Sequence, residues 1–374
     1  MKEEEEEEEE EVKMKDNIGC IDWVKGWMNV ISEMLFQRIA SKHLHNPIPL
    51  PSLHNLTFIV TGSTSGIGLQ TARQLAESGA HVIMAVRNTN AAHELIQKWQ
   101  TESPSQGLPL NIEVMEIDLL SLESVTRFAD LYNARSEPLH ALINNAGICS
   151  VGVPQTFSKD GHEVQMQVNH LATALLSVLL LPSLIRGSPS RIINVNSVVH
   201  SLGFVDPEDM SVVKGNRKYT GVVGYSSSKL AQVMFSGILQ KRLPAECGIS
   251  VVCVSPGIVK TNVVRDLPKI FQAAFAWTPY FFLSPEEGSR SSLFAATDPQ
   301  VPEYCESLKA DKRSACAFFS QDCRPSNPAK EAWNTETSRR VWEKTFEMVG
   351  LPVDAVDNLV RGKEVKCSFG DQYR

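Results

Sequence analysis

A tyrosine and a lysine stand four positions apart in the segment GYSSSKLA, residues 224–231. At this spacing Tyr225 and Lys229 project from the same face of a helix. A phenol has an ordinary pKa of about 10, and a nearby positive charge favours its ionised form and lowers that pKa. The pair could therefore move a proton to or from a substrate oxygen, although the spacing alone also fits two ordinary helix residues.

A glycine-rich segment, TGSTSGIGLQTARQLAESGA, directly follows the apolar run 56–60 and opens a helical pattern. Gly62 allows a tight turn, and Gly66 and Gly68 let a phosphate and the neighbouring strand approach the backbone. The N-terminus of the helix then faces a pyrophosphate with free N–H groups and the positive end of its dipole. A strand before the turn and a helix after it favour a nucleotide site over a merely structural turn.

Short apolar runs alternate with amphipathic stretches between residues 55 and 300. Turn residues bound each run, and the segments between runs are long enough for helices. This alternation predicts βαβ units and a doubly wound α/β fold with a parallel sheet covered on both faces. Strands are expected at 56–60, 81–86, 112–117, 140–144, 191–196 and 249–254.

Composition divides the chain into four parts. Residues 1–19 include nine glutamates in one run, whose mutual repulsion predicts a disordered acidic tail. Residues 20–54 join an amphipathic pattern at 20–40 to a proline-rich linker. The central domain is expected over residues 55–300, and residues 301–374 are expected to elaborate the same domain.

Charge and cysteine usage argue against several classes of protein. The net charge is −7 and no strong basic patch occurs, which argues against a nucleic-acid partner. The acidic start argues against a signal peptide, and eight cysteines without a CxxC pair predict neither a metal site nor a disulfide framework. A reducing, cytoplasmic location follows. The run 171–185 contains Pro182 and is too short to span a membrane, so it predicts a buried helix.

The pattern at 20–40 places apolar residues at three- and four-residue steps, with polar residues opposite. Its charges exclude a membrane span. Two tryptophans suit a helix lying in a membrane interface, but the polar face is not rich in lysine or arginine. Packing on the body of the protein is the common alternative, and both remain open. The apolar set is Ile21, Val24, Trp27, Met28, Ile31, Met34 and Leu35, and the polar set is Asp22, Lys25, Asn29, Ser32 and Glu33.

The spacing TGxxxGIG resembles the short-chain dehydrogenase/reductase family, and further segments match that family in its order. They are INNAG, VNHL, NVNS, YSSSK and SPGIVKT, so the resemblance covers about residues 55–262. The segment 318–351 is similar to the ending of retinol-dehydrogenase-like members. The resemblance implies a Rossmann-type single domain of about seven strands with N- and C-terminal extensions. It also implies hydride transfer between a nicotinamide cofactor and an alcohol or carbonyl, with a dimer or tetramer as a family expectation.

The resemblance also implies a role for each matching residue. Tyr225 would be the general acid/base, and Lys229 would lower its pKa and bind the nicotinamide ribose. Ser197 would hydrogen-bond the substrate oxygen, and Asn169 would hold a water on the proton path. The implied cofactor-binding set is Thr61, Gly62, Ser63, Ser65, Gly66, Ile67, Gly68, Arg87, Asp118, Leu119, Asn145, Ala146, Gly147, Tyr225, Lys229, Pro256, Gly257, Ile258 and Thr261.

The end of the second expected strand indicates which cofactor is preferred. Val86 stands where an acidic residue would bind the 2′-hydroxyl of NAD, and the guanidinium of Arg87 can pair with a phosphate. This predicts NADP(H). Segments 200–224 and 262–290 are apolar enough to predict a hydrophobic substrate, such as a retinoid, steroid or lipid-derived carbonyl. The alternative is a regulatory protein that binds NADP(H) with little turnover.

Overall fold

All six apolar runs form strands of one parallel sheet, each within one residue of its expected ends. The structure is a computed structural model that describes residues 20–102, 110–214, 218–261, 281–310 and 316–370. The strands are β1 (Thr57–Thr61), β2 (His81–Val86), β3 (Ile112–Glu116), β4 (Ala141–Asn144), β5 (Ser190–Val195), β6 (Ile249–Val254) and β7 (Ala317–Phe319).

The sheet has seven strands in the order β3-β2-β1-β4-β5-β6-β7, which confirms the predicted doubly wound fold. Ile59 pairs with Ile83 on one side and with Leu142 on the other. Farther along the sheet, Ile193 of β5 pairs with Val252 of β6. The central strands read as continuous apolar runs because both faces of the sheet are covered.

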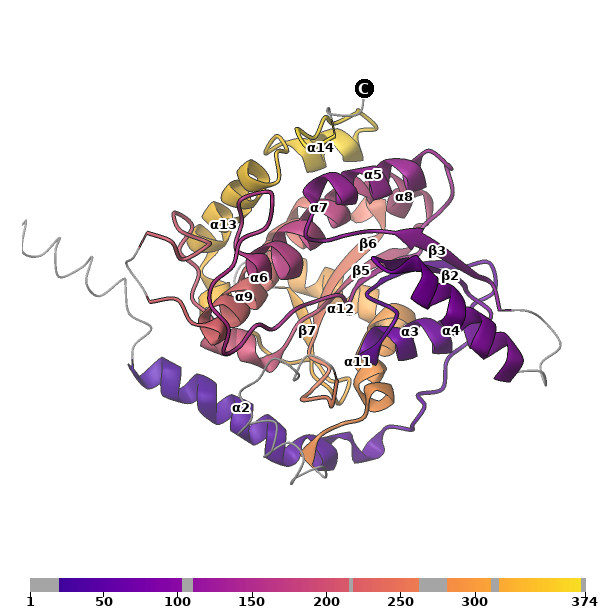
Figure 1. The fold of residues 1–374 in the computed structure, drawn as a ribbon, viewed down its shortest axis with the longest axis horizontal. Helices are drawn as coiled ribbons and strands as arrows, with labels where there is room; N and C mark the ends of the chain where they lie inside the picture. The colour runs from indigo at the N-terminus through magenta and orange to yellow at the C-terminus, as the bar shows by residue number, and fades with distance from the viewer. Residues whose placement is uncertain (1–19, 103–109, 215–217, 262–280, 311–315, 371–374) are drawn as a thin grey trace, which may run out of the picture.

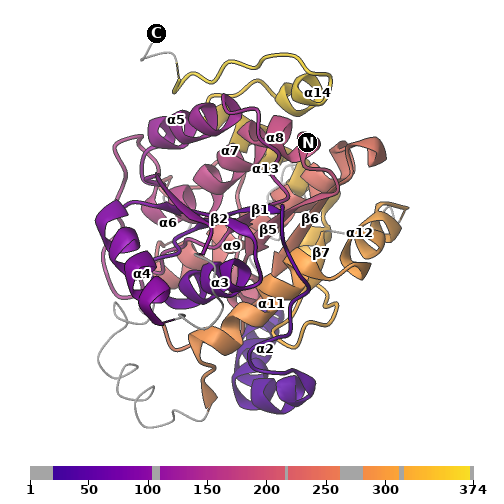
Figure 2. The same ribbon diagram turned by 90° about the vertical axis from the view of Figure 1, so that its right-hand side faces the viewer.

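Helices cover both faces of the sheet, as Figures 1 and 2 show. One face carries α5 (Leu122–Asn133), α6 (Val164–Met166), α7 (Ala172–Leu179), α8 (Leu181–Arg186), α9 (Gly221–Arg242), α13 (Thr335–Met348) and α14 (Ala355–Val360). The other face carries α3 (Gly66–Glu77), α4 (Thr89–Glu102), α11 (Pro285–Thr297) and α12 (Gln300–Ala310).

The run 171–185 is buried as predicted. A single π-helical turn, η3 (Gln167–Leu171), leads into α7, and all eight residues of α7 are buried. Pro182 lies in the first turn of α8. Backbone N–H groups in a first turn have no partner within the helix, so the missing N–H of proline breaks no helical hydrogen bond there. No helix in the described part of the chain is long and apolar enough to cross a membrane.

The C-terminal region contributes to both the sheet and its cover. Its short strand β7 extends the sheet beside β6, and α13 packs on α9. The ring of Trp342 stacks on that of Phe235 at 4.8 Å between centroids, and Phe346 packs beside both. No alternating or apolar run predicted β7 because it has only three residues.

The first described helix, α2 (Cys20–Ala40), lies outside the two layers at one end of the sheet (Figures 1 and 2). It contacts η4 (Val198–Leu202) closely, since a Cβ on Gly26 would lie 2.7 Å from a methyl carbon of Leu202. Its polar side faces the body: Gln37 is buried, and its amide bonds the backbone of Ile258. The helix therefore packs on the protein, but with the face opposite to the one its apolar pattern favours.

Candidate active site

A cavity of 420 Å³ lies at the carboxyl ends of the parallel strands. The segments after β1, β2, β3, β4 and β5 all line it, because parallel strands end at the same edge of a sheet. In open α/β folds ligands bind in the crevice at this edge. The lysine and tyrosine of α9 line the same cavity as the glycine-rich turn.

The glycine-rich turn has the backbone that its sequence predicts. Gly62 and Gly66 adopt φ values of +66° and +56°, a region that L side chains rarely adopt. A Cβ on Gly62 would also lie 2.9 Å from the Cβ of Ala146. Helix α3 begins at Gly66, and the side chain of Ser65 makes no capping bond. The first N–H groups of α3 therefore face the cavity, where an anionic group could accept from them.

A small polar network ties the turn to the segment after β4. The hydroxyl of Thr61 accepts from the backbone N–H groups of Asn145 and Ala146, both at 3.0 Å. The amide of Asn145 donates back to the carbonyl of Thr61 at 2.9 Å. The NNAG segment thus holds the glycine turn against β4, and its exposed atoms form one wall of the cavity.

Most of the predicted cofactor-binding residues line this cavity. Ser63 and Gly68 are buried behind the turn, and Gly257 and Ile258 contact Gln37 of α2 instead. The predicted residues that line the cavity are Thr61, Gly62, Ser65, Gly66, Ile67, Arg87, Asp118, Leu119, Asn145, Ala146, Gly147, Tyr225, Lys229, Pro256 and Thr261.

The helix α9 that carries the tyrosine and lysine is held close to the end of β5. Thr220 caps its N-terminus by accepting from the N–H of Val223 at 3.2 Å. The amide of Asn196 donates to the carbonyl of Lys229 at 2.8 Å and to the side chain of Gln232 at 2.9 Å. Asn196 therefore fixes α9 relative to the strand end.

Tyr225 lines the cavity and faces Ser197, which does not itself line it. A side-chain hydrogen bond joins Tyr225 to Ser197. Burial nevertheless raises the pKa of Tyr225 well above its ordinary value of 10.0, and the hydrogen bond from Ser197 only partly offsets this effect. The phenol is therefore protonated at neutral pH. Lys229, which was predicted to lower this pKa, is not among the groups that shift it here.

Lys229 is almost fully buried, with 3% of its surface exposed. Its ammonium donates to the carbonyl of Val195 at 2.7 Å. Burial lowers the pKa of Lys229 from 10.5 to about 8. Below that pH the ammonium places a positive charge inside the cavity. It lies beside Gly147, because a Cβ added to Gly147 would be 3.6 Å from the ammonium nitrogen.

Asn169 lies behind the tyrosine, in the π-helical turn η3. Its side chain accepts from the N–H of Ile148 and donates to the carbonyl of the same residue, both at 2.9 Å. It also donates to the hydroxyl of Ser228 at 3.0 Å. The extra residue of a π turn is a frequent feature of functional sites, and here it brings the amide between the NNAG segment and α9.

Several lining residues were not predicted. Thr64 belongs to the glycine-rich turn, and Asn88 is exposed directly after Arg87 at the end of β2. Both residues follow the end of a strand, and this position could have identified them as lining residues from the sequence. Cys149, expected to pack as a small apolar side chain, is half-buried at the cavity wall.

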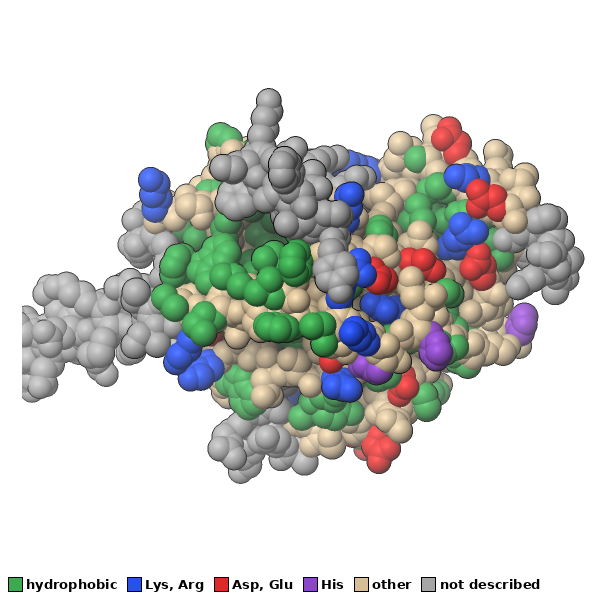
Figure 3. All heavy atoms as spheres, turned by 90° about the horizontal axis from the view of Figure 1, so that it is seen from below, with side chains coloured by type: hydrophobic (Ala, Val, Ile, Leu, Met, Phe, Trp, Pro, Cys, Tyr) green, Lys and Arg blue, Asp and Glu red, His purple; other side chains and the backbone are tan. Residues whose placement is uncertain are grey.

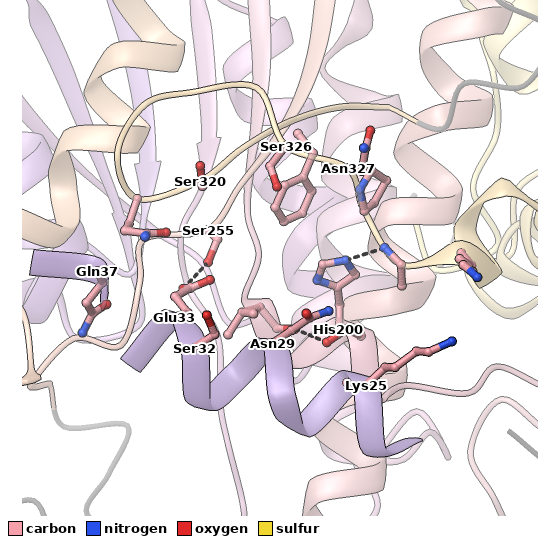
Figure 4. A pocket seen from close by; sticks show the side chains of 18 of the residues that line it. Lys25, Asn29, Ser32, Glu33, Gln37, His200, Ser255, Ser320, Ser326 and Asn327 are labelled. Carbon is pink, nitrogen blue, oxygen red and sulfur yellow. Dashed lines mark hydrogen bonds between the residues drawn. The ribbon is translucent and has the colours of Figure 1, made fainter. Parts of the chain in front are cut away.

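A second cavity, of 610 Å³, lies between the polar side of α2, η4 and the segment after β7 (Figure 4). Glu33 of α2 points into it and accepts from the hydroxyl of Ser255 at 3.3 Å. Burial raises the pKa of Glu33 from 4.5 to about 7, the hydrogen bond from Ser255 lowers it, and the charge of Asp322 raises it. The sequence placed Glu33 on the polar side of a helix but could not indicate that the body of the protein covers this side.

His200 links the second cavity to Ser197 (Figure 4). Its Nε2 accepts from the N–H of Ala329 at 3.0 Å, so Nδ1 carries the proton and donates to the carbonyl of Ser197 at 2.6 Å. Burial lowers the pKa of His200 to about 4, so the ring is neutral. The histidine holds the backbone of Ser197 against the C-terminal region.

Comparisons with known proteins agree with this arrangement. The sequence profile described as "short chain dehydrogenase" matches residues 56–206 and 209–270. "Dehydrogenase/reductase SDR family member FEY" of Arabidopsis thaliana is 66% identical over 361 residues, 96% of each chain. "Retinol dehydrogenase 11" of Homo sapiens is 34% identical over 79% of this chain and 86% of its own. The predicted similarity to retinol-dehydrogenase-like members is confirmed.

Solved structures share the fold. An uncharacterised protein of Mycobacterium paratuberculosis matches with a TM-score of 0.61 and 30% identity over 80% of this chain and 95% of its own. The complex of Pseudomonas aeruginosa RhlG with NADP matches with a TM-score of 0.52 and 26% identity over 67% of this chain and 92% of its own. The fold, the order of the motifs and these matches together show that the chain belongs to the short-chain dehydrogenase/reductase family of oxidoreductases.

Proposed function

We propose that this protein is an NADP(H)-dependent oxidoreductase that interconverts a hydrophobic carbonyl compound and its alcohol. The observation that carries the proposal is that Tyr225 and Lys229 line the same 420 Å³ cavity as the glycine-rich turn and Arg87. A group bound at the turn therefore shares one cavity with a proton donor. Residues 55–300 form the proposed cofactor-binding domain, and residues 301–374 complete it by adding β7 and α13.

The cavity wall suits a dinucleotide. The N-terminus of α3 would hold the pyrophosphate, and Asp118 lies at the opposite wall with Leu119. Glycine is needed at positions 62 and 147 because a Cβ would lie 2.9 Å from the Cβ of Ala146 and 3.1 Å from the side-chain oxygen of Asn169, respectively. Arg87 is exposed at the rim, where its guanidinium can pair with a 2′-phosphate. The NADP complex of the similar Pseudomonas protein supports this choice of cofactor.

The side chains would divide the work as follows. When bound, the nicotinamide donates or accepts a hydride. The raised pKa of Tyr225 keeps its phenol protonated, so in carbonyl reduction it can give its proton to the oxygen as the hydride reaches the carbon. Ser197 would hold the same oxygen, and Lys229 would supply positive charge and ribose contacts. Asn169 would connect the tyrosine to solvent through a water.

The hydrophobic class of the substrate rests on similarity, because the relatives named retinol dehydrogenase act, by their names, on a hydrophobic alcohol. Segment 200–224, expected to help form the pocket, mixes apolar residues with six charged ones and does not line the 420 Å³ cavity. The other expected pocket segment, 262–290, falls largely outside the described residues. The proposed location is cytoplasmic, and the proposed assembly is a homo-oligomer, as the family resemblance implies.

A substrate panel tests the proposal. Purified protein should oxidise NADPH in the presence of retinoid, steroid and medium-chain lipid aldehydes and ketones, monitored by loss of absorbance at the dihydronicotinamide band. Small polar carbonyls serve as the comparison and should react more slowly, because they bury less apolar surface. NADPH binding without turnover on any member of the panel would instead favour the alternative, a regulatory NADP(H)-binding protein.

Arg87 should determine the cofactor preference. Arg87→Ala removes a charge-assisted hydrogen bond to the 2′-phosphate, so the Kd for NADPH should rise about 10- to 100-fold while the Kd for NADH stays the same. Titration calorimetry with both cofactors measures this. Arg127→Ala is the matched control because Arg127 is also an exposed arginine but does not line the cavity. Equal affinity for the two cofactors in both variants and in the wild type would contradict the prediction.

A further inference from the structure

His200 is a buried histidine whose two ring nitrogens each have a backbone partner. Only 4% of its surface is exposed. Its Nδ1 donates to the carbonyl of Ser197 at 2.6 Å, and its Nε2 accepts from the N–H of Ala329 at 3.0 Å. These two partners lie far apart in the chain. The ring therefore joins the segment after β5 to the C-terminal region.

The C-terminal side of this link rests on the sheet and on two helices. The ring of His200 packs on that of Phe318, with 4.9 Å between the ring centroids. Phe318 belongs to β7 and pairs with Cys253 of β6. Ala329 directly precedes η8 (Lys330–Trp333), which contacts α9 and α13. His200 is thus anchored to elements of the core.

Helix α2 covers the outer side of η4, the short helix that carries His200. A Cβ on Gly26 of α2 would lie 2.8 Å from the carbonyl oxygen of Ser201, so the two helices are in close contact. The outward side of α2 carries the band of hydrophobic side chains seen in Figure 3. Enclosure by these elements keeps the ring neutral, because burial lowers the pKa of His200 to about 4. A neutral ring can donate from one nitrogen and accept at the other.

Ser197 is held at each of its polar atoms. Its N–H donates to the side-chain oxygen of Asn196 at 2.9 Å. Its carbonyl accepts from the backbone N–H of His200 at 3.1 Å and, at a shorter distance, from the ring. Its hydroxyl accepts from the N–H of Val199 at 3.3 Å and bonds Tyr225. The direction of the hydroxyl therefore depends on Asn196 on one side and on His200 on the other.

We propose that His200 is a positioning residue of the active site, which aligns the Ser197 hydroxyl with Tyr225 by tying the backbone of Ser197 to the C-terminal region. This role rests on the proposed function, in which Ser197 holds the substrate oxygen. His200 does not line the 420 Å³ cavity, so it acts through Ser197. A displacement of about 1 Å in an active site can cost about 10²-fold in rate. The C-terminal region thereby supports catalysis, although none of its described residues lines that cavity.

Three variants separate the two bonds of the ring. In His200→Asn the amide nitrogen takes the place of Nδ1 and can still donate to Ser197, but the bond to Ala329 is lost. In His200→Gln the amide oxygen takes the place of Nε2 and can still accept from Ala329, but the bond to Ser197 is lost. His200→Phe keeps a ring against Phe318 and loses both bonds. We expect kcat on a carbonyl substrate to fall about 10- to 100-fold in the Phe and Gln variants, and less in the Asn variant. The Kd for NADPH should stay unchanged in all three, because His200 does not line the cavity.

Combination with Ser197→Ala tests whether the effect passes through Ser197. Because Ser197→Ala leaves no hydroxyl to align, His200→Phe should then lower kcat by less than about twofold. A general loss of folded protein would instead lower kcat by the same factor in both backgrounds. His162→Phe is the matched control and should keep kcat. His162 also bonds the backbone of the C-terminal region, at the carbonyl of Met348 at 3.1 Å, but it does not line the cavity.

Fluorine NMR of protein labelled with fluorotyrosine tests the same role without a substrate. The Tyr225 resonance, assigned by its loss in Tyr225→Phe, reports the bond between the phenol and Ser197. Ser197→Ala should shift this resonance, and His200→Phe should shift it in the same direction, with no further shift in the double variant.

The proposal is overturned if His200→Phe leaves the Tyr225 resonance in place, or if it lowers kcat by the same factor in both backgrounds. It is also overturned if His200→Gln retains more kcat than His200→Asn, because the bond to Ala329 would then be the one that matters. If His200→Phe does not fold, the same comparisons with His200→Gln decide the question. A shifted resonance in a protein whose wild type turns over no carbonyl would overturn the proposed function alone.

Discussion

Tyr225→Phe should lower kcat by about 10²–10⁴-fold on a carbonyl substrate, the range expected for loss of a general acid. The substitution removes the phenolic hydroxyl that Ser197 bonds and leaves the ring in place. The Kd for NADPH should change little, because the ring still covers the same wall of the cavity. Single-turnover oxidation of bound NADPH, compared with an equilibrium titration of NADPH, separates the two quantities.

Ser197→Ala provides the matched comparison for this result. It removes the partner of the phenol but leaves the acid, so its effect on kcat should be smaller than that of Tyr225→Phe. Activity of Tyr225→Phe close to that of the wild type on any productive substrate would show that another group delivers the proton. The folded state should be retained in both variants, since each removes one hydroxyl at a half-buried position.

Lys229→Met should abolish most turnover and yet raise the stability of the fold at neutral pH. Burial lowers the lysine pKa from 10.5 to about 8, so the folded state carries a penalty for keeping this group charged. Methionine removes that penalty but leaves the carbonyl of Val195 without its donor. We expect a net gain in the free energy of unfolding on the order of 1–2 kcal/mol at pH 7.

The same shift sets the sign of the pH dependence. Between pH 8 and 10.5 the lysine is neutral in the folded state and charged in the unfolded state. The unfolded state then binds more protons, so the wild type gains stability as pH rises through this window. The stability advantage of Lys229→Met should therefore shrink between pH 8 and 9.5 in urea titrations. An advantage that is constant with pH, or a loss of stability at pH 7, would contradict this account.

The loss of turnover should arise from cofactor and proton chemistry together. Without the ammonium, kcat should fall about 10²–10³-fold, the usual cost of removing one preorganised electrostatic group. The Kd for NADPH should rise as well, in contrast to Tyr225→Phe. Such a gain in stability with a loss of activity is the trade-off expected where an active site contains a buried charged group that lowers the stability of the fold.

The fold could be predicted from the sequence because parallel strands buried on both faces leave a clear local signal. Runs such as 81–86 and 249–254 are apolar throughout and bounded by turn residues, so their ends were predicted within one residue. Among the described residues only β7 was missed as a strand, since three residues carry no periodicity. It is a strand because β6 offers an open edge beside it.

The cofactor-facing residues were largely predictable for the same reason. A tight turn that needs φ values near +60° selects glycine, so Gly62 and Gly66 are visible in the sequence. Strand ends converge at one edge of a parallel sheet, which brings Arg87 and Asp118 to the cavity that the turn lines. Ser63 and Gly68 stand in the same motif but lie behind it, a distinction that depends on packing.

What the sequence alone determined about this protein is the order of its elements, the identity of its family and the residues around its cavity. The tertiary structure alone decided the direction of two pKa shifts and the side on which α2 packs. The pKa of Tyr225 is raised because burial outweighs the neighbouring groups. The apolar side of α2 is exposed because its polar side bonds the backbone of Ile258 and the hydroxyl of Ser255 at the sheet edge. Both outcomes depend on distances between segments that are far apart in the chain. Helical and strand periodicity carry no information about those distances.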